Sequence, residues 1–501
     1  MRYEAARLSV HFQGGDMSLS GALSNAISGL TAATRSAQIV SSNMANSMTD
    51  GYGRRDVELQ SQDARGGGVK VLGTVRHRQP ALVAEMRDAN SNQAAQETIS
   101  TFQKKLEQLV GTPDLASSLT ARMARFEAAL VSAISRPDLS GRLDQVVREA
   151  SSISESLNTT SQGIQDMRVA ADRKIHSAVE LLNTKLSQVQ ELNVQIAGGS
   201  TAKRDVSALV DYRESLITEI ASFVPVKEMQ RPNQGIALYT QGGALLLDGA
   251  AAEISYTNAH TIVPHMTIDA GHLSGIAING VDISLSAQNS PLRGGELAAL
   301  FQIRDDLAVN AQSELDALAR DLTERLQAPG LDPTLAPGSP GLFTDAGTLF
   351  EASNEVGIAR RITVNQIVDP DQGGASWHLR DGFGAATIGS VGDASLLQAF
   401  STSFNASQSL SSGSFSAQSA SASDLASLVA GKFGAQRLSA EQDLTFAAVR
   451  AAETKQFLLN DGVDSDQEMQ KLMQIEQAYA ANARVLQTVD DMMNVLMGAI
   501  G

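Results

Sequence analysis

Apolar residues recur every seven positions along the C-terminal segment of the chain. One row holds Leu472, Tyr479, Leu486, Met493 and Ile500, and a second row, three residues further on, holds Ile475, Asn482, Val489 and Leu496. Two rows with this offset are typical of a helix that packs against a partner in a coiled coil. Ser465 and Glu468 match a capping box, in which a hydroxyl and a carboxylate bond the free amides of a helix start. The pattern predicts a C-terminal coiled-coil helix over residues 465–501.

A second seven-residue repeat, rich in alanine, lies near the N-terminus. Its rows are Leu19, Ala26, Ala33 and Val40, and Leu23, Leu30, Ala37 and Met44. Because small side chains permit a close approach, this helix is the expected partner of the C-terminal one. We predict an assembly interface made of Leu23, Leu30, Ala37, Met44, Leu472, Ile475, Tyr479, Asn482, Leu486, Val489, Met493 and Leu496. The polar Asn482 would fix the register of the pair at some cost in stability.

Between the two repeats, the period of the apolar residues changes several times. Alternating residues such as Val57, Leu59, Val69 and Val71 predict a hairpin or extended arm after the first helix. The expected segments are an N-terminal helix and arm (17–81), a helical body (82–224), a β-rich outer domain (225–293), a long helix of the body (294–328), a loop with further β segments (329–400), a Ser-rich linker (401–424) and a returning part of the helical body (425–464). The expected fold is mainly α with an embedded β domain, and both chain ends belong to one helical end.

The first residues do not match the pattern of the rest. Residues 1–16 are expected to be a non-native or disordered extension, because the codons of Gly14-Gly15-Asp16 would resemble a ribosome-binding site just before Met17. This stretch has no apolar core of a signal peptide. No run of apolar residues is long enough for a membrane span, so membrane insertion is not expected.

Composition and charge narrow the classes of function. Lys and Arg number 39 against 55 Asp and Glu, and the net charge of −16 argues against binding nucleic acid or an anionic membrane. The chain has no cysteine, which excludes disulfides, thiolate nucleophiles and thiolate metal sites. Aromatic residues make up only 4%, which favours long helices with small-residue seams over a thick aromatic core.

The candidates for chemistry are weak, and no catalytic, cofactor or metal site is predicted. They are the histidines His260, His265 and His272, the acidic pairs Asp305-Asp306 and Asp490-Asp491, and Trp377. The histidine spacing is irregular, which favours surface loops over metal ligands. The acidic pairs are expected on solvated helix faces, and Trp377 is expected to anchor the β core, with sugar stacking as its alternative. Nothing assembles a nucleophile, a base and an oxyanion site.

Two terminal motifs point to a known family. Ser42-Asn43-Met44-Ala45-Asn46, then Thr49 and Gly51-Tyr52, resembles the N-terminal signature of bacterial flagellar rod, hook and hook-associated axial proteins. Its motif residues here are Asn43, Asn46, Thr49, Gly51 and Tyr52. The run from Gln477 to Leu486 resembles the hook-associated, hook–filament junction branch of this family, and so do Leu209–Arg213 and the stretch from Gly295 to Asp306. One departure is Gln467-Glu468, where the family usually has an acidic pair.

The resemblance implies a structural, non-enzymatic subunit of the flagellum that joins hook to filament. Its expected partners are copies of itself in a ring, the hook protein, the second hook–filament junction protein and an export chaperone at the C-terminal helix. The expected location is the extracellular flagellum, reached by type III export without a cleaved signal peptide. No cofactor is expected. The alternatives are another axial protein, such as the hook protein or the second junction protein, and an exported enzyme with helical docking ends. Such an enzyme would need two carboxylates across a cleft near Trp377.

Overall fold

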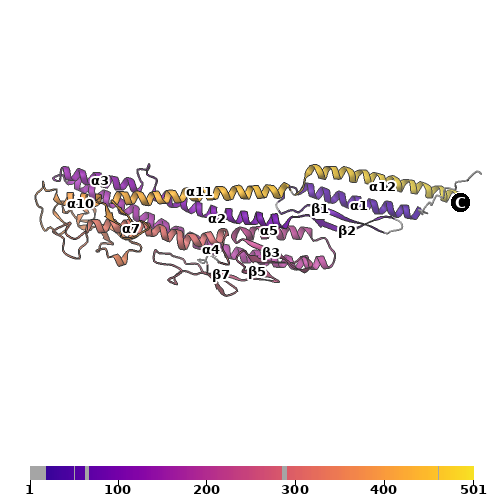
Figure 1. The fold of residues 1–501 in the computed structure, drawn as a ribbon, viewed down its shortest axis with the longest axis horizontal. Coiled ribbons are helices and arrows are strands. Elements are labelled where there is room, and N and C mark those ends of the chain that lie inside the picture. The colour runs from indigo at the N-terminus through magenta and orange to yellow at the C-terminus, as the bar shows by residue number, and fades with distance from the viewer. Residues whose placement is uncertain (1–18, 50, 63–66, 285–289, 461, 501) are drawn as a thin grey trace, which may run out of the picture.

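The protein is an elongated rod built mainly from long helices (Figure 1). The computed structural model describes residues 19–49, 51–62, 67–284, 290–460 and 462–500, so the expectation for residues 1–16 lies outside the described part of the chain. The mainly α fold with embedded β strands is confirmed. The first described helix and the last helix lie together at one end of the rod (Figure 1).

The helices differ greatly in length. In chain order they are α1 (Leu19–Ala45), α2 (Pro80–Val110), α3 (Leu119–Ser135), α4 (Ser140–Thr201), α5 (Ser207–Phe223), α6 (Gly295–Gln302), α7 (Ala308–Leu326), α8 (Ile358–Arg361), α9 (His378–Asp381), α10 (Ser395–Asn405), α11 (Ala422–Asn460) and α12 (Ser465–Ile500). A π-helical turn, Ile303–Leu307, joins α6 to α7. Residues 295–326 therefore form one continuous helical stretch.

The strands are short and form small antiparallel sheets. They are β1 (Arg55–Ser61), β2 (Val69–Arg76), β3 (Val226–Gln230), β4 (Ile236–Thr240), β5 (Leu245–Asp248), β6 (Ala250–Ala251), β7 (Ile254–Tyr256), β8 (Ile276–Ile278), β9 (Val281–Ile283), β10 (Phe343–Asp345), β11 (Ile362–Val364), β12 (Gln408–Ser409) and β13 (Ser419–Ala420). β1 pairs with β2 as a hairpin, β3 to β6 form one sheet and β7 to β9 another.

Helix α4 is the spine of the rod. Its 62 residues span roughly 93 Å at 1.5 Å per residue. Apolar residues at three- and four-residue spacing, such as Leu182, Leu186 and Val189, are buried along its length. The helix continues through Gly198 and Gly199 and ends at Thr201. A Cβ on Gly199 would lie 2.4 Å from Val206, so the glycine lets the returning chain pack closely.

Side-chain amides of α4 hold the β sheets along its flank (Figure 1). Asn193 donates to the carbonyl of Ile236 at 2.9 Å. Asn183 donates to the carbonyl of Ile254 at 2.7 Å and accepts from its amide at 2.9 Å. These bonds satisfy strand groups that have no neighbour in the sheet, so the two small sheets need the helix to complete them.

A buried arginine ties the π-helical turn to α4 and to the β region. Arg304 has no exposed side-chain surface and pairs with Asp172 of α4 at 2.9 Å and with Asp305 at 2.8 Å. It also donates to the hydroxyl of Tyr256, which itself donates to Asp172. Burial raises the pKa of the Tyr256 hydroxyl far above its usual value, so the phenol remains a donor. This network fixes the inner β region against the helical body.

Two expectations about the second half of the chain are not met. The Ser-rich segment 401–424 does not form a flexible linker, because it contains part of α10 and the β12–β13 pair, and it buries Phe404 and Leu410. Arg325 of α7 donates to the carbonyls of Ser403 and Ala420 at 3.2 and 2.6 Å, which holds this segment against the body. Trp377 lies at the start of the short helix α9, stacked on His378, and not in a strand.

Candidate assembly interface

Helices α1 and α12 lie side by side and run in opposite directions (Figure 1). Asn43, near the end of α1, bonds Glu468 near the start of α12, whereas Gly29 meets Asn482 further along. A Cβ on Gly29 would lie 2.6 Å from Asn482 Nδ2, so only glycine permits this close approach without a shift of Asn482. The two ends of the chain therefore form an antiparallel helix pair within one subunit.

The residues predicted for the interface on α12 are unevenly covered. Val489 is buried, and Leu472, Ile475, Asn482 and Leu486 are half-buried. Tyr479, Met493 and Leu496 each remain 48% exposed. Because α1 is antiparallel, its described start lies level with roughly the region of Met493, so the last turns of α12 have no described partner. The described part of one subunit thus leaves much of this apolar row uncovered.

The residues predicted for the interface on α1 lie at the edge of the helix pair. Leu23 is 36% exposed, and Leu30, Ala37 and Met44 are half-buried. Gly29 and Asn43, each one position before a predicted residue, contact Asn482 and Glu468 of α12. The close approach of the two helices thus depends on a small and a polar residue, whereas hydrophobicity selects the larger side chains.

Asn43 is the polar centre of the helix pair. Its side chain is fully buried, and its amide nitrogen donates to the Arg55 carbonyl at 2.8 Å and to Glu468 Oε2 at 3.0 Å. Its amide oxygen accepts from the Tyr52 hydroxyl at 2.9 Å and from the Arg55 amide at 3.1 Å. Both donor hydrogens and both acceptor lone pairs of the amide are therefore used, as a side-chain amide allows.

The other motif residues build the turn that brings Tyr52 back to α1. Asn46 donates to the Ser42 carbonyl at 2.9 Å and closes the end of the helix. The Tyr52 amide donates to the Thr49 carbonyl at 3.1 Å, and the Thr49 hydroxyl lies 3.4 Å from Asn46 Oδ1. Gly51 has φ 83°, a conformation that glycine adopts without strain. The turn therefore positions the tyrosine hydroxyl on Asn43.

The capping box predicted at the start of α12 is not formed. Asp464 caps the helix, because its carboxylate accepts from the amides of Asp466 and Gln467 at 2.9 and 3.1 Å. Glu468 is instead completely buried against α1 and the hairpin. Its Oε1 accepts from Arg54 at 3.1 Å, and its Oε2 accepts from Asn43. Glu468 is thus a buried partner of the motif, a role that its spacing within the helix did not reveal.

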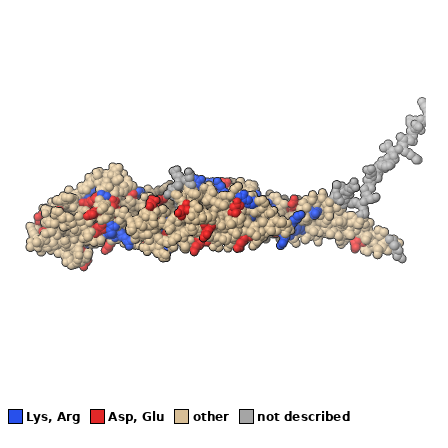
Figure 2. Space-filling model, turned by 90° about the horizontal axis from the view of Figure 1, so that it is seen from below, with Lys and Arg blue, Asp and Glu red and all other residues tan. Residues whose placement is uncertain are grey.

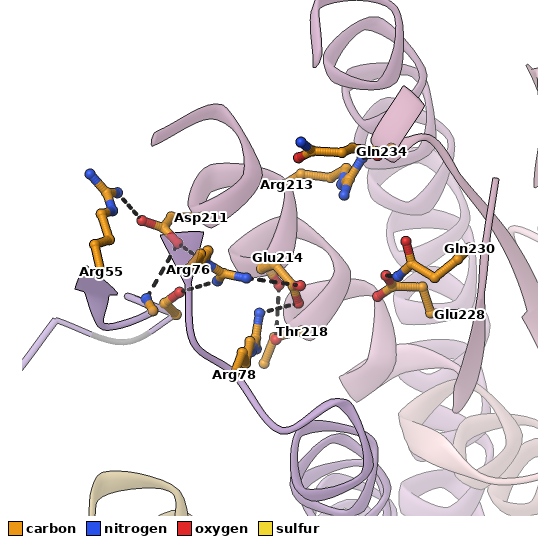
Figure 3. Close-up of polar contacts among 12 residues, drawn as sticks. Arg55, Arg76, Arg78, Asp211, Arg213, Glu214, Thr218, Glu228, Gln230 and Gln234 are labelled. Carbon is orange, nitrogen blue, oxygen red and sulfur yellow. Dashed lines mark hydrogen bonds and ion pairs between the residues drawn. The ribbon is translucent and has the colours of Figure 1, made fainter. Parts of the chain in front are cut away.

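A second cluster of charges joins the β1–β2 hairpin to α5 of the body, as Figure 3 shows. Asp211 accepts from Arg76 at 2.7 Å and pairs with Arg55. Glu214, one turn further along α5, pairs with Arg78 and Arg87. Arg87 also lies 3.2 Å from Glu228 of β3. The sequence singled out Asp211 as part of a family stretch but gave no sign of its arginine partners.

The carboxyl of Glu214 responds to two opposing effects. Burial pushes its pKa upward, but attraction to Arg78, Arg87, Arg76 and Arg213 outweighs burial and holds the pKa below its usual value. Burial is also the main reason why the pKa of Arg78 falls below its usual range. Glu214 therefore stays ionised at neutral pH, and the hairpin is fixed electrostatically to the body.

The terminal-helix end differs in surface character from the body. In Figure 2 charged side chains are scattered along the body, but few lie on the visible face of this end. Large apolar residues of both terminal helices are exposed, among them Ile27, Val485, Met492, Val495 and Met497. Apolar surface of this extent marks a site of protein association.

The described residues that were considered for metal binding or catalysis are not brought together into one site. His265 and His272 stack edge to face with ring centroids 5.7 Å apart. Within the described ranges, no group of three or more His, Asp or Glu could hold a metal ion. Asp305 is not on a solvated face as expected, because it pairs with the buried Arg304. None of the described helices is long and apolar enough to cross a membrane.

Two protein families match separate parts of the chain. The family described as Flagellar hook-associated protein FlgK helical domain matches residues 103–339. The family described as Flagellar basal body rod FlgEFG protein C-terminal matches residues 454–498. The first covers most of the helical body with its β sheets, and the second covers α12 up to Gly498, including Val489.

Relatives from different bacteria share one name. Flagellar hook-associated protein 1 of Salmonella typhimurium is 25% identical over 331 residues, which cover 62% of this chain and 58% of that protein. Flagellar hook-associated protein 1 of Bacillus subtilis is 20% identical over 526 residues, which cover 94% of this chain and 96% of that protein. The solved hook junction protein FlgK of Burkholderia pseudomallei aligns with a TM-score of 0.42 and 18% identity, over 53% of this chain and 47% of that one. The chain spans 58% of the Salmonella relative it matches, and its matched segments are similar to flagellar hook-associated protein 1.

Proposed function

We propose that this protein is a structural subunit of the bacterial flagellum that joins the hook to the filament. The observation that carries the proposal is the antiparallel pair of terminal helices, fixed at Asn43 and Glu468 and still exposing large apolar residues. Helices that need partners at a chain end are suited to building a continuous tube from many subunits. The relatives named flagellar hook-associated protein 1 support the same role.

The mechanism is geometric and involves no catalysis. The buried bonds of Glu468 and the arginine cluster around Glu214 hold the helix pair at a fixed angle to the body. Force along the tube then passes through the hairpin and α5 into α4, which spans most of the rod. A stiff subunit of this kind can contact the hook lattice through one part of its surface and the filament side of the junction through another.

The proposed partners follow from this position. They are further copies of the chain in a ring, the hook protein, the second hook–filament junction protein and an export chaperone that covers the exposed apolar face of α12 before assembly. The proposed location is the extracellular flagellum, reached by export through the type III apparatus without a cleaved signal peptide. The exposed Val495 and Met497 of α12 support a need for such cover.

The test is a strain from which the gene has been deleted. We expect it to retain hooks, to lack filaments and to release flagellin monomers into the medium, all restored by expression of the intact chain. Electron microscopy of isolated hooks and quantification of flagellin in the supernatant measure both effects. Normal filaments in the deletion strain would rule out the proposed junction role.

A further inference from the structure

Helix α11 carries apolar residues on two opposite faces. Ala440, Ala447, Ala451 and Thr454 are buried, and α11 lies alongside α2 over this region. On the other side, Phe446 and Phe457 are 75% and 63% exposed, and Leu438 and Val449 are about half exposed. A helix in a finished structure seldom exposes two phenylalanines to this degree, because burying each would be favourable.

These exposed residues lie on one face of the helix, and we call them the α11 stripe (Leu438, Phe446, Val449 and Phe457). The stripe has two rows, one made of Leu438 and Val449 and the other of Phe446 and Phe457. Within each row the two residues are about three helical turns apart and therefore point the same way. Of the charged residues in this part of the helix, only Glu453 falls between the rows, whereas Asp443 and Arg450 lie along one edge. The stripe has the form of an apolar ridge with a charged rim.

A groove of matching character lies elsewhere on the same body. It has a volume of about 360 Å³ and lies between α2, α4 and α6. Its floor includes Phe102, Met167 and Leu300, and Ala94, Thr98 and Thr101 line its α2 side. Glu97 and Lys105 of α2 and Lys174 of α4 stand exposed at its rim, and Glu296 of α6 also lines it. We call it the α2–α4 groove.

The ridge and the groove lie at the same height along the rod but on opposite sides of it. Glu107 of α2 faces α11, where it pairs with Arg437 at 2.7 Å. Thr98 is about half a turn away around α2 from Glu107, so the groove opens on the far side of α2 from α11. Glu85 and Arg450, 3.9 Å apart, place the two helices antiparallel over this length. The stripe therefore cannot reach the groove of its own subunit.

The charges of the stripe and of the α2 side of the groove are arranged in complementary order, and the two remaining charges of the groove, Lys174 and Glu296, are of opposite sign. At the side nearer to the terminal helices, Arg450 of the stripe corresponds to Glu97 of the groove. At the side further from them, Asp443 of the stripe corresponds to Lys105 of the groove. The spacing between the two charges is nearly the same on both surfaces, roughly 10 to 12 Å along the helix axis. Parallel copies with an axial step of roughly 5 to 10 Å would bring opposite charges together.

We propose that the α11 stripe of one subunit packs into the α2–α4 groove of the next copy of the same chain. One chain supplies both surfaces, so the contact is head to tail and closes into a ring or continues as a helix. A different partner would account for only one of the two surfaces. This inference rests on the proposed function, since it presumes that copies assemble side by side.

Cysteine cross-linking in isolated hook–filament structures tests the contact. The chain has no cysteine of its own, so the unmodified chain contributes no cross-links. With Phe446→Cys and Thr98→Cys in one chain, oxidation or a short bismaleimide should give a ladder of dimers and higher multimers. Each single variant should remain monomeric, and so should the matched control of Phe446→Cys with Val194→Cys, since Val194 is 68% exposed on α4 outside the groove.

Two results would overturn the contact. One is the absence of a ladder from the double variant in structures that contain it, repeated with Val449→Cys and Thr101→Cys. The other is equal cross-linking of Phe446→Cys alone, which would show a symmetric contact between two α11 stripes. Either result leaves the junction role standing if the deletion strain lacks filaments. Attached filaments in that strain would instead contradict the proposed junction function.

Discussion

Replacing Asn43 with alanine is expected to release the start of α12 from α1 while the helical body stays folded. The substitution removes four hydrogen bonds at once, those to Glu468, to Tyr52 and to both backbone groups of Arg55. It leaves the Glu468 carboxylate with Arg54 and Lys471 as its remaining partners, at 3.1 and 3.4 Å. The loss is therefore local to the joint between the two ends of the chain.

The size of the effect follows from the kinds of bond that are lost. A buried hydrogen bond to a charged group contributes about 1.5–3 kcal/mol, and a neutral one about 1 kcal/mol. The bond to Glu468 and the three neutral bonds together suggest a loss of about 4.5–6 kcal/mol before any compensation. Water entering the opened joint offsets part of this cost, so about 3 kcal/mol is the working value. That corresponds to an increase of roughly a hundredfold in local opening.

Hydrogen exchange followed by mass spectrometry measures this opening segment by segment. Exchange in 465–478 should accelerate by roughly a hundredfold in Asn43→Ala, whereas exchange in the buried part of α4 should not change. Ser41→Ala is the matched control, because Ser41 is exposed on the same helix. If exchange at the start of α12 stays within about twofold of the unmodified chain, the joint does not hold the two helices together.

Three further predictions concern other parts of the molecule. Because the pKa of Glu214 is lowered in the folded chain, its carboxylate stabilises the hairpin at neutral pH, and this contribution is lost as pH falls from the usual glutamate pKa of about 4.3 through the lower folded pKa. Hydrogen exchange in the hairpin should therefore rise in that pH window. An exchange rate that shows no such rise would contradict the charge network. Arg304→Met leaves the buried Asp172 carboxylate without its arginine and should lower the free energy of unfolding by about 3–5 kcal/mol in denaturant titrations; a change below about 1 kcal/mol would contradict it. Gly29→Ala should loosen α12 in limited proteolysis because its Cβ would meet Asn482, and Asn482→Ala in the same chain should restore resistance; failure of this rescue would show that the two residues do not set the spacing.

Apolar periodicity was sufficient to predict the long helices and the β region. The helix at each end and the change to alternating residues after Pro225 are strong repeating signals, and the structure has α1, α12 and the β3–β9 strands in these places. The Ser-rich segment was misjudged for the opposite reason. Its few apolar residues, such as Leu410, are spaced irregularly, and its order depends on bonds from the distant Arg325.

The polar joint could not be predicted, because its members are far apart in the sequence. Asn43 and Glu468 are brought together only by the fold, and no local pattern links an N-terminal asparagine to a C-terminal glutamate. The spacing of Glu468 from Ser465 offered a plausible local role that the structure assigns to Asp464. The role of Gly29 on the α1 side could not be predicted either, because close packing depends on small residues, which hydrophobicity does not detect.

The most direct test of the central claim uses one substitution in the predicted interface row of α12. Leu486→Asp, expressed in the deletion strain, places a charge in the half-buried face between Asn482 and Val489. The purified variant should keep the melting temperature of the body, and cells should carry hooks without filaments. Ile388→Asp, at an exposed loop of the body, is the control and should restore filaments. Cells that swim normally with Leu486→Asp would contradict the claim that the terminal helices are the assembly device.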